Sequence, residues 1–269
     1  MPLLSINFPM TFFCERQSIS KLLNLAERNY SGSIQKISDD TGIPTGKSSG
    51  KVKPHIDYAT GMGLINPGFD KGIYYLTLTS FGKIVQKSDP FLDLPITQWL
   101  AHANMCDPID GANSWVKIFT DWITTDTRSK DLISSIADIP MTKLRPLFQM
   151  YEKRESFGKI GVLRKEGDEF RRIQASISYE WNRGYSALIL SLLERYFHSE
   201  GRKQISIPEF IQVTKLPYRF FWQGDDFLRV MQNLTSLGFV KISNLVDPPV
   251  IQSLVSAEQV WGTIYDDIV

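Results

Sequence analysis

The order of elements predicted for residues 33–87 constrains the fold of this chain more than any other feature. Residues 33–44 have the apolar spacing of a short helix, and Gly42 and Pro44 close it. Residues 52–62 predict a second helix, because apolar side chains recur there at steps of four, three and three. A Gly- and Ser-rich turn joins the two helices, so the pair forms a helix-turn-helix.

A hairpin and a further helix complete this segment. Residues 66–72 read NPGFDKG and contain the Pro and Gly of a chain reversal, and the β-branched and aromatic run at 73–79 predicts the returning strand. Thr79 or Ser80 then caps another helix. Helix, turn, helix, hairpin and helix in this order is typical of a winged helix-turn-helix, which lays its second helix in a DNA groove.

The last ninety residues repeat this pattern loosely, since residues 234–243 and residues 59–67 both run from a helix through a glycine into an apolar strand. Between these two regions the chain predicts several helices and a hairpin that turns at Glu166, Gly167 and Asp168. We therefore expect a mainly α fold with small winged-helix sheets (α+β). It has three parts: an N-terminal winged helix-turn-helix at 1–89, a central helical segment with a hairpin at 90–180, and a second winged-helix-like unit at 181–269.

Composition indicates the cellular compartment of the protein. The 269 residues are 42% hydrophobic, which predicts a packed core, but no run approaches the eighteen apolar residues of a membrane helix. The N-terminus lacks the basic head and small-residue cleavage site of a signal peptide. Cys14 and Cys106 are the two cysteines, too few for a disulfide scaffold. We expect a cytoplasmic protein without a membrane segment.

The net charge of +1 hides an uneven distribution. Residues 1–87 carry ten Lys or Arg and six Asp or Glu, and residues 88–140 carry three and eight. Residues 141–180 carry nine and six, and residues 181–269 carry eight and nine. A basic segment beside an acidic one is compatible with nucleic acid at one face and a protein at another.

Residues 89–102, DPFLDLPITQWLAH, resemble a bacterial family of unknown function, numbered four thousand and seven among such domains. The matching positions are Asp89, Pro90, Phe91, Leu92, Asp93, Pro95, Thr97, Trp99, Leu100 and His102. Blocks at 61–65, 76–82, 114–122, 205–213 and 225–238 extend the resemblance over nearly the whole chain. The chain lacks the His-Glu pair with which family members usually open.

The resemblance implies a genetic context and assigns no catalytic residue. The family is often encoded beside reductases similar to those acting on phosphoadenosine phosphosulfate, in islands for DNA sulfur modification or phage defence. From the residues themselves, Trp99 and His102 lie one helical turn apart, and we expect both in the core or at an interface.

Two groups of residues are candidate contact sites. The DNA-contact candidates lie in the turn, at the start of the second helix and in the hairpin, where lysines meet phosphates: Lys47, Ser48, Lys51, Lys53, His55 and Lys71. Their alternative role is that of solvated side chains at a helix start. The partner-contact candidates come from an aromatic loop, which alternatively stacks nucleobases or fills the junction with the middle segment: Tyr218, Arg219, Phe221 and Trp222.

The sequence offers no constellation of catalytic residues. Gly42 and Gly46 are separated by three residues and follow a helix, whereas a phosphate-binding P-loop has four and follows a strand. The three His and two Cys are not spaced as metal ligands. We expect a non-catalytic protein without cofactor or metal that binds double-stranded DNA and a sulfur-transfer or modification enzyme, or a second copy of itself. The alternative is an adaptor that docks such an enzyme without touching DNA.

Overall fold

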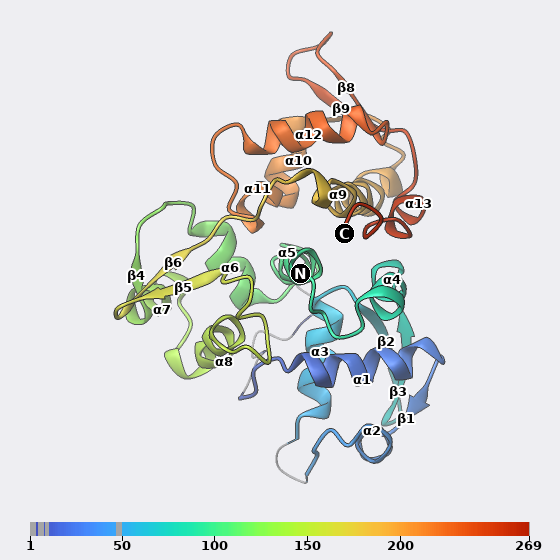
Figure 1. Cartoon of the computed structure of the whole chain (residues 1–269), viewed down its shortest axis with the longest axis vertical. Helices are drawn as coiled ribbons and strands as arrows, with labels where there is room; N and C mark the ends of the chain where they lie inside the picture. Colours follow the sequence, from blue (N-terminus) through green and yellow to red (C-terminus); the bar gives the residue numbers. More distant parts are fainter. Residues whose placement is uncertain (1–3, 5–7, 9–10, 47–49, 269) are drawn as a thin grey trace. The chain divides into compact units, whose positions relative to one another are not determined.

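A computed structural model describes residues 4, 8, 11–46 and 50–268, and the chain divides into two compact units, residues 1–173 and 174–269. About half of the chain is helical, and the strands form small antiparallel sheets (Figure 1). The expected α+β class is therefore confirmed. The first two predicted parts, 1–89 and nearly all of 90–180, share the first unit.

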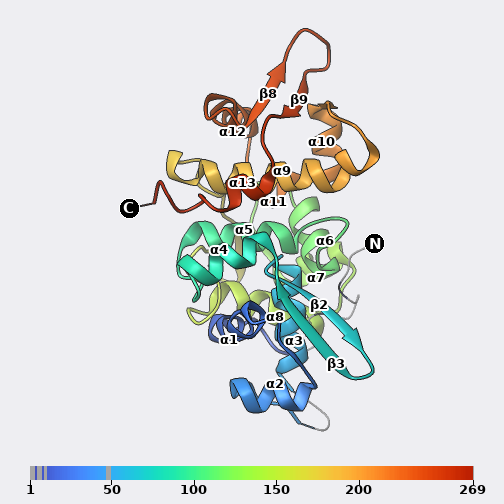
Figure 2. The ribbon, with the colours of Figure 1, turned by 90° about the vertical axis from the view of Figure 1, so that its right-hand side faces the viewer.

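The first unit opens with helices around a three-stranded sheet. Its elements are α1 (Arg16–Glu27), β1 (Ser31–Gly32), α2 (Ile34–Thr41), α3 (Val52–Gly61), β2 (Ile65–Asp70), β3 (Ile73–Leu78) and α4 (Ser80–Ser88). The sheet order is β1-β3-β2, and Figure 2 shows β2 and β3 as a long hairpin. Lys71 and Gly72 alone form its turn, and their φ angles are both positive, at 45° and 85°. A two-residue turn with positive φ at both positions has a twist that matches the twist of the two strands it joins. The turn is therefore shorter than the predicted 66–72, and Pro67 lies in the edge strand β2, where a missing N–H is tolerated.

The remainder of the first unit contains the same order again. Its elements are α5 (Pro95–Met105), α6 (Asn113–Asp121), β4 (Arg128–Ser129), α7 (Lys130–Ala137), α8 (Met141–Glu152), β5 (Leu163–Glu166) and β6 (Glu169–Arg172). The sheet order is β4-β6-β5, with the short strand beside the last one, as in the first sheet. The predicted hairpin turn at Gly167 is confirmed, because Glu166 pairs with Glu169.

The second unit gives the order a third time. Its elements are α9 (Asn182–Tyr196), β7 (Ile205–Ser206), α10 (Ile207–Thr214), α11 (Leu216–Arg219), α12 (Asp226–Ser236), β8 (Val240–Ser243), β9 (Val250–Ser253) and α13 (Ala257–Trp261), with short 3-10 turns at Tyr179–Trp181 and His198–Glu200. The sheet order is β7-β9-β8. We call the elements α1 to β3, α6 to β6 and α9 to β9 the first, second and third repeats.

The three repeats share a twelve-residue segment that the sequence analysis did not recognise. It reads SIQKISDDTGIP at 33–44, SKDLISSIADIP at 129–140 and SIPEFIQVTKLP at 206–217. In each copy a serine hydroxyl accepts a hydrogen bond from a backbone N–H in the first turn of an eight-residue helix. In each copy a left-handed residue then ends the helix: Gly42, Asp138 and Lys215, with φ of 68°, 52° and 54°.

Apolar side chains in this segment anchor each copy in a core. The fourth helical residue is buried in all three copies, as Ile37, Ile133 and Phe210. The residue after the left-handed turn is buried as well, as Ile43, Ile139 and Leu216. A proline follows each time and favours an extended conformation for that buried residue. The spacing from Ser to Pro was the signal that would have revealed the second repeat, which the sequence analysis described only as helical with a hairpin.

A buried polar network joins α5, α6 and α8 in the first unit. Trp115 Nε1 donates a hydrogen bond of 2.7 Å to Tyr151 Oη, and His102 Nδ1 lies 2.6 Å from the same oxygen. Because the indole is a donor only, the Tyr151 oxygen accepts the Trp115 hydrogen bond, and the contact with His102 is a second hydrogen bond at the same oxygen. Trp99 is also buried, and its ring contacts that of His102. The expected core position of Trp99 and His102 is therefore confirmed.

The start of α5 depends on the first residue of the same motif. Asp89 is buried, and its carboxylate accepts hydrogen bonds from the backbone N–H groups of Asp93 (2.8 Å) and Leu94 (3.0 Å). Pro95 is the first helical residue, where its missing N–H costs nothing. Asp89 and Pro95 thus fix where α5 begins, and this start places Trp99 and His102 on the buried side.

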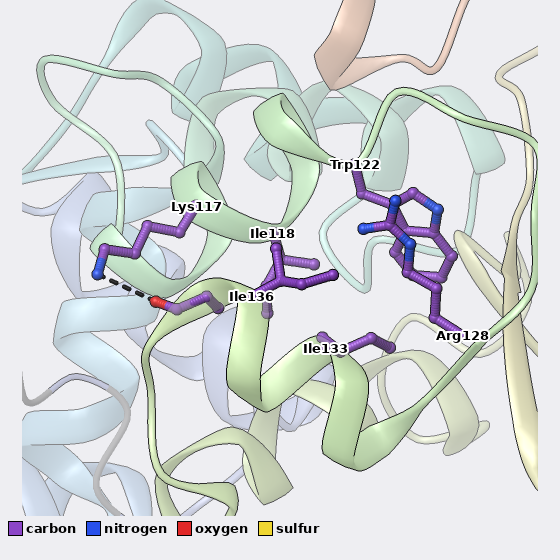
Figure 3. Close-up of a pocket in the computed structure, with 7 residues that line it drawn as sticks. Lys117, Ile118, Trp122, Arg128, Ile133 and Ile136 are labelled. Carbon is purple, nitrogen blue, oxygen red and sulfur yellow. Dashed lines mark hydrogen bonds between the residues drawn. The ribbon is translucent and has the colours of Figure 1, made fainter.

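Figure 3 shows the packing of α6 against α7 in the second repeat. Lys117 Nζ donates a 3.0 Å hydrogen bond to the carbonyl of Ala137, at the negative end of α7. The Arg128 guanidinium lies 4.9 Å from the centre of the Trp122 ring. The cavity between these side chains has a volume of about 10 Å³, which is room for no more than a single water. We exclude it as a ligand site.

The buried network predicts the effect of removing one hydroxyl. Tyr151→Phe leaves the Trp115 N–H and the His102 ring without their shared partner, so we expect the free energy of unfolding to fall by about 1–3 kcal/mol. Tyr75→Phe is the matched control, because about half of the Tyr75 side chain is exposed to solvent, and it should change stability by less than about 0.5 kcal/mol. Urea unfolding of the three proteins measures this, and equal midpoints for both variants would contradict the role of the network.

Candidate nucleic-acid interface

The predicted DNA contacts at the start of α3 are engaged in ion pairs. Lys51 Nζ lies 2.5 Å from Glu15 Oε1, and it also faces the Phe12 ring. Lys53 Nζ lies 2.6 Å from Asp57 Oδ2, one turn along the helix. All four side chains of these pairs are partly exposed. Such pairs contribute only about 0–1 kcal/mol, so a phosphate can replace either carboxylate at small cost.

His55 lies inside the first repeat, which corrects the expectation that it contacts DNA. Its side chain is 0% exposed. Nε2 accepts a 3.1 Å hydrogen bond from the Glu15 backbone N–H, and Nδ1 lies 2.7 Å from the Lys51 carbonyl oxygen. Nδ1 therefore carries the hydrogen. The physical reason is helical phase: His55 is three residues from Val52 and four from Ala59, so it shares their buried face.

The hairpin β2–β3 presents the remaining described candidate, whereas Lys47 and Ser48 lie outside the described residues. Lys71 is exposed in the two-residue turn. Phe69 on β2 is 64% exposed, and Tyr75 on β3 is exposed as well. The hairpin thus offers a cation and two aromatic rings to a partner. A charged tip beside aromatic side chains suits contact with a nucleic-acid backbone or with a protein.

A groove of about 360 Å³ brings part of the first repeat together with helix α8 of the second. Its lining residues are Thr11, Phe12, Phe13, Glu15, Lys51, Thr142, Arg145, Pro146 and Gln149. Arg145 and Gln149 were not among the predicted contacts, because the sequence pattern of residues 141–152 indicates no more than a helix. The Ser-to-Pro spacing at 129–140 matches that at 33–44 and would have pointed to the helix that follows it.

The aromatic loop of the second unit is interior, which corrects its assignment as a partner-binding surface. Arg219 is 0% and Trp222 5% exposed, Phe221 is also buried, and Tyr218 is half-buried. The Trp222 ring lies 4.9 Å from Tyr185 on α9, centre to centre. Phe221 has a φ of 56° at the sharp turn after α11. This turn directs the loop's side chains into the core of the unit.

Metal ligation and membrane insertion find no support in the described part of the chain. No group of three or more His, Cys, Asp or Glu side chains there is arranged to hold a metal ion. No described helix is long and apolar enough to cross a bilayer.

Comparison with known proteins gives structural similarity without sequence similarity. No family model matches the sequence, and no curated protein matches it. Two crystal structures of SspB are similar to this chain, one of them described as bound to magnesium ion, with TM-scores of 0.68 and 0.66. Each alignment has 13% sequence identity and covers 95% of this chain and 86% of SspB. The chain therefore shares the SspB fold.

The buried His55 predicts a pH dependence of stability. Burial lowers its pKa below the ordinary value of 6.5, and this outweighs the hydrogen bond to the Lys51 carbonyl and the charge of Glu15. Below pH 6.5 the unfolded chain therefore binds a proton at His55 that the folded chain does not. The free energy of unfolding should fall as the pH drops through 6.5 and level off below the lowered pKa.

Denaturant unfolding between pH 5 and 8 tests this dependence. His55→Gln should remove the His55 contribution and give a flatter profile than the parent. An unchanged profile would show that His55 is accessible to protons in the folded state and would contradict the buried placement.

Proposed function

We propose that this chain is a non-catalytic DNA-binding protein whose repeats are winged helices, and that it acts as a subunit or regulator in a DNA sulfur-modification or phage-defence system. The repeated order of helix, strand, two helices and hairpin carries the proposal, because winged helix-turn-helix proteins use this order to place a helix in a DNA groove. The setting is supported by similarity to SspB, a protein of a phosphorothioation system, and by the family resemblance of residues 89–102.

In this proposal the first repeat contributes phosphate contacts. Lys71 extends from the hairpin turn, and Lys51 and Lys53 release Glu15 and Asp57 to bind phosphates, together with Lys47 and Ser48. The exchange of a carboxylate for a phosphate is favourable. Each lysine now pairs with a single, partly hydrated carboxylate, whereas a duplex presents two phosphates per base pair.

The salt dependence of duplex binding tests the proposal. The logarithm of the association constant should fall against the logarithm of salt concentration with a slope of about −0.9 per neutralised phosphate. The combined substitutions Lys51→Ala, Lys53→Ala and Lys71→Ala should weaken binding and reduce the slope by up to about 3.

The control is the double substitution Lys83→Ala with Lys87→Ala, which removes two exposed lysines of α4. Fluorescence anisotropy measures the affinities. Undiminished binding by the triple variant would contradict the first-repeat contacts, and no duplex binding at low salt would contradict the function.

The second candidate function is that of an adaptor for a sulfur-transfer enzyme related to phosphoadenosine phosphosulfate reductases. It is favoured by apolar side chains at the tip of the third repeat, where Leu245 is 95% exposed and Val246 is exposed beside it. Residues 181–269, with eight Lys or Arg and nine Asp or Glu, have a net charge of −1, which does not attract DNA. A partner enzyme or a second copy of the chain would cover this apolar tip.

Co-expression with a sulfur-transfer enzyme of this reductase class tests the adaptor role. Leu245→Ser with Val246→Ser should abolish co-purification if the apolar tip is the contact, because two exposed apolar anchors are lost. Leu132→Ser on α7, where Leu132 is also exposed, is the control for removing an exposed apolar side chain elsewhere. Co-purification that survives the double substitution, or a parent that does not associate, would exclude docking at this tip.

A further inference from the structure

We propose that helix α8 of the second repeat is the principal duplex-reading helix, and that the groove beside it holds one phosphodiester strand of double-stranded DNA. This inference rests on the proposed DNA-binding function and assigns its main contact to a part of the chain that the sequence pattern left without a role. Three side chains of α8 define the contact, which we call the α8 face: Thr142, Arg145 and Gln149.

The geometry of the second repeat fits this role better than that of the first. Residues 138–140 alone separate α7 from α8, the three-residue turn of a DNA-binding helix-turn-helix. In the first repeat residues 42–51 separate α2 from α3. The exposed and half-exposed positions of α3 are Lys53, Pro54, Asp57 and Thr60, and the two charged ones neutralise each other. Helix α3 therefore offers few groups to a base edge.

The α8 face has the opposite character. Its residues follow one another at steps of three and four, so their side chains lie along one side of the helix. Thr142 and Arg145 are exposed, Gln149 is half-buried, and all three line the groove. Arg145 forms no ion pair with any described residue within 4.0 Å. Thr, Arg and Gln are side chains that hydrogen-bond to base edges and phosphates.

Lys51 lines the same groove and comes from the first repeat. A phosphodiester strand in the groove would meet both Arg145 on α8 and Lys51, and Lys51 would exchange Glu15 for a phosphate. Gln149 would then face the bases. The half-exposed rings of Phe12 and Phe13 line the groove and limit the water that competes for these contacts.

The charge of the surrounding segment favours a polyanion over a protein partner. Residues 141–172 contain nine Lys or Arg and five Asp or Glu, a net charge of +4. Arg164 and Lys165 on β5 are exposed, and strand β5 packs against α8. Duplex DNA is the partner that such a concentration of positive charge fits, since it presents phosphates on both strands of each groove.

Two single substitutions test the inference on the full chain. With a duplex that the parent selects from a random pool, Arg145→Ala should weaken binding at least about fivefold and reduce the salt slope by about 1. Gln149→Ala should weaken binding to that duplex by a similar factor but leave the slope unchanged, because glutamine is neutral. Arg145→Lys should restore the slope. Lys87→Ala on α4 is the matched control and should change affinity less than twofold.

The outcomes separate this inference from the proposed function. If the parent binds the duplex and both α8 variants bind as the parent does, α8 does not read DNA, while DNA binding by the chain stands. If the parent fails to bind duplex DNA at low salt, both are overturned. Thermal unfolding should show each variant melting with the parent, because both positions are solvent-accessible; if Arg145→Ala does not fold, Arg145→Gln takes its place.

Discussion

The repeated twelve-residue segment is the constraint from which the rest of this structure follows. A serine cap fixes where each eight-residue helix begins, a left-handed residue fixes where it ends, and the apolar residue before the proline is drawn into the core. The next helix and hairpin are then built from a defined starting point. The segment occurs three times, so the same cap, helix and turn precede each of the three hairpins. Outside this segment the three repeats differ widely in sequence.

The first unit needs more than this local constraint, because it combines two repeats with α4 and α5. The hydrogen bonds that Trp115 and His102 share with Tyr151 join α6, α5 and α8 at one buried oxygen. Such a network is costly when incomplete and therefore selects one arrangement of the three helices. The motif from Asp89 to His102 is explained by this role: Asp89 starts α5, and Trp99 and His102 anchor it.

The repeats share a topology but differ in the chemistry of their surfaces. Helix α3 exposes a self-neutralised ion pair, α8 exposes Thr142, Arg145 and Gln149, and the third repeat exposes apolar side chains at Leu245 and Val246. One topology copied three times therefore presents three chemically different surfaces. Polar contacts of the first and second repeats meet at the groove, which joins Lys51 to the α8 face.

The sequence by itself determined the element order in residues 33–87, the hairpin at Gly167 and the core positions of Trp99 and His102, since periodicity, turn residues and caps are local signals. The sequence also contains the signal for the second repeat, namely the Ser-to-Pro spacing at 129–140. This spacing was recognised only by comparing the three helices in the structure. Tertiary structure alone decided that Arg219, Phe221 and Trp222 are interior and that Lys51 and Arg145 line one groove. Proximity depends on contacts between residues far apart in the chain. A local pattern marks the apolar face of a helix, but it does not show which other segments lie against that helix.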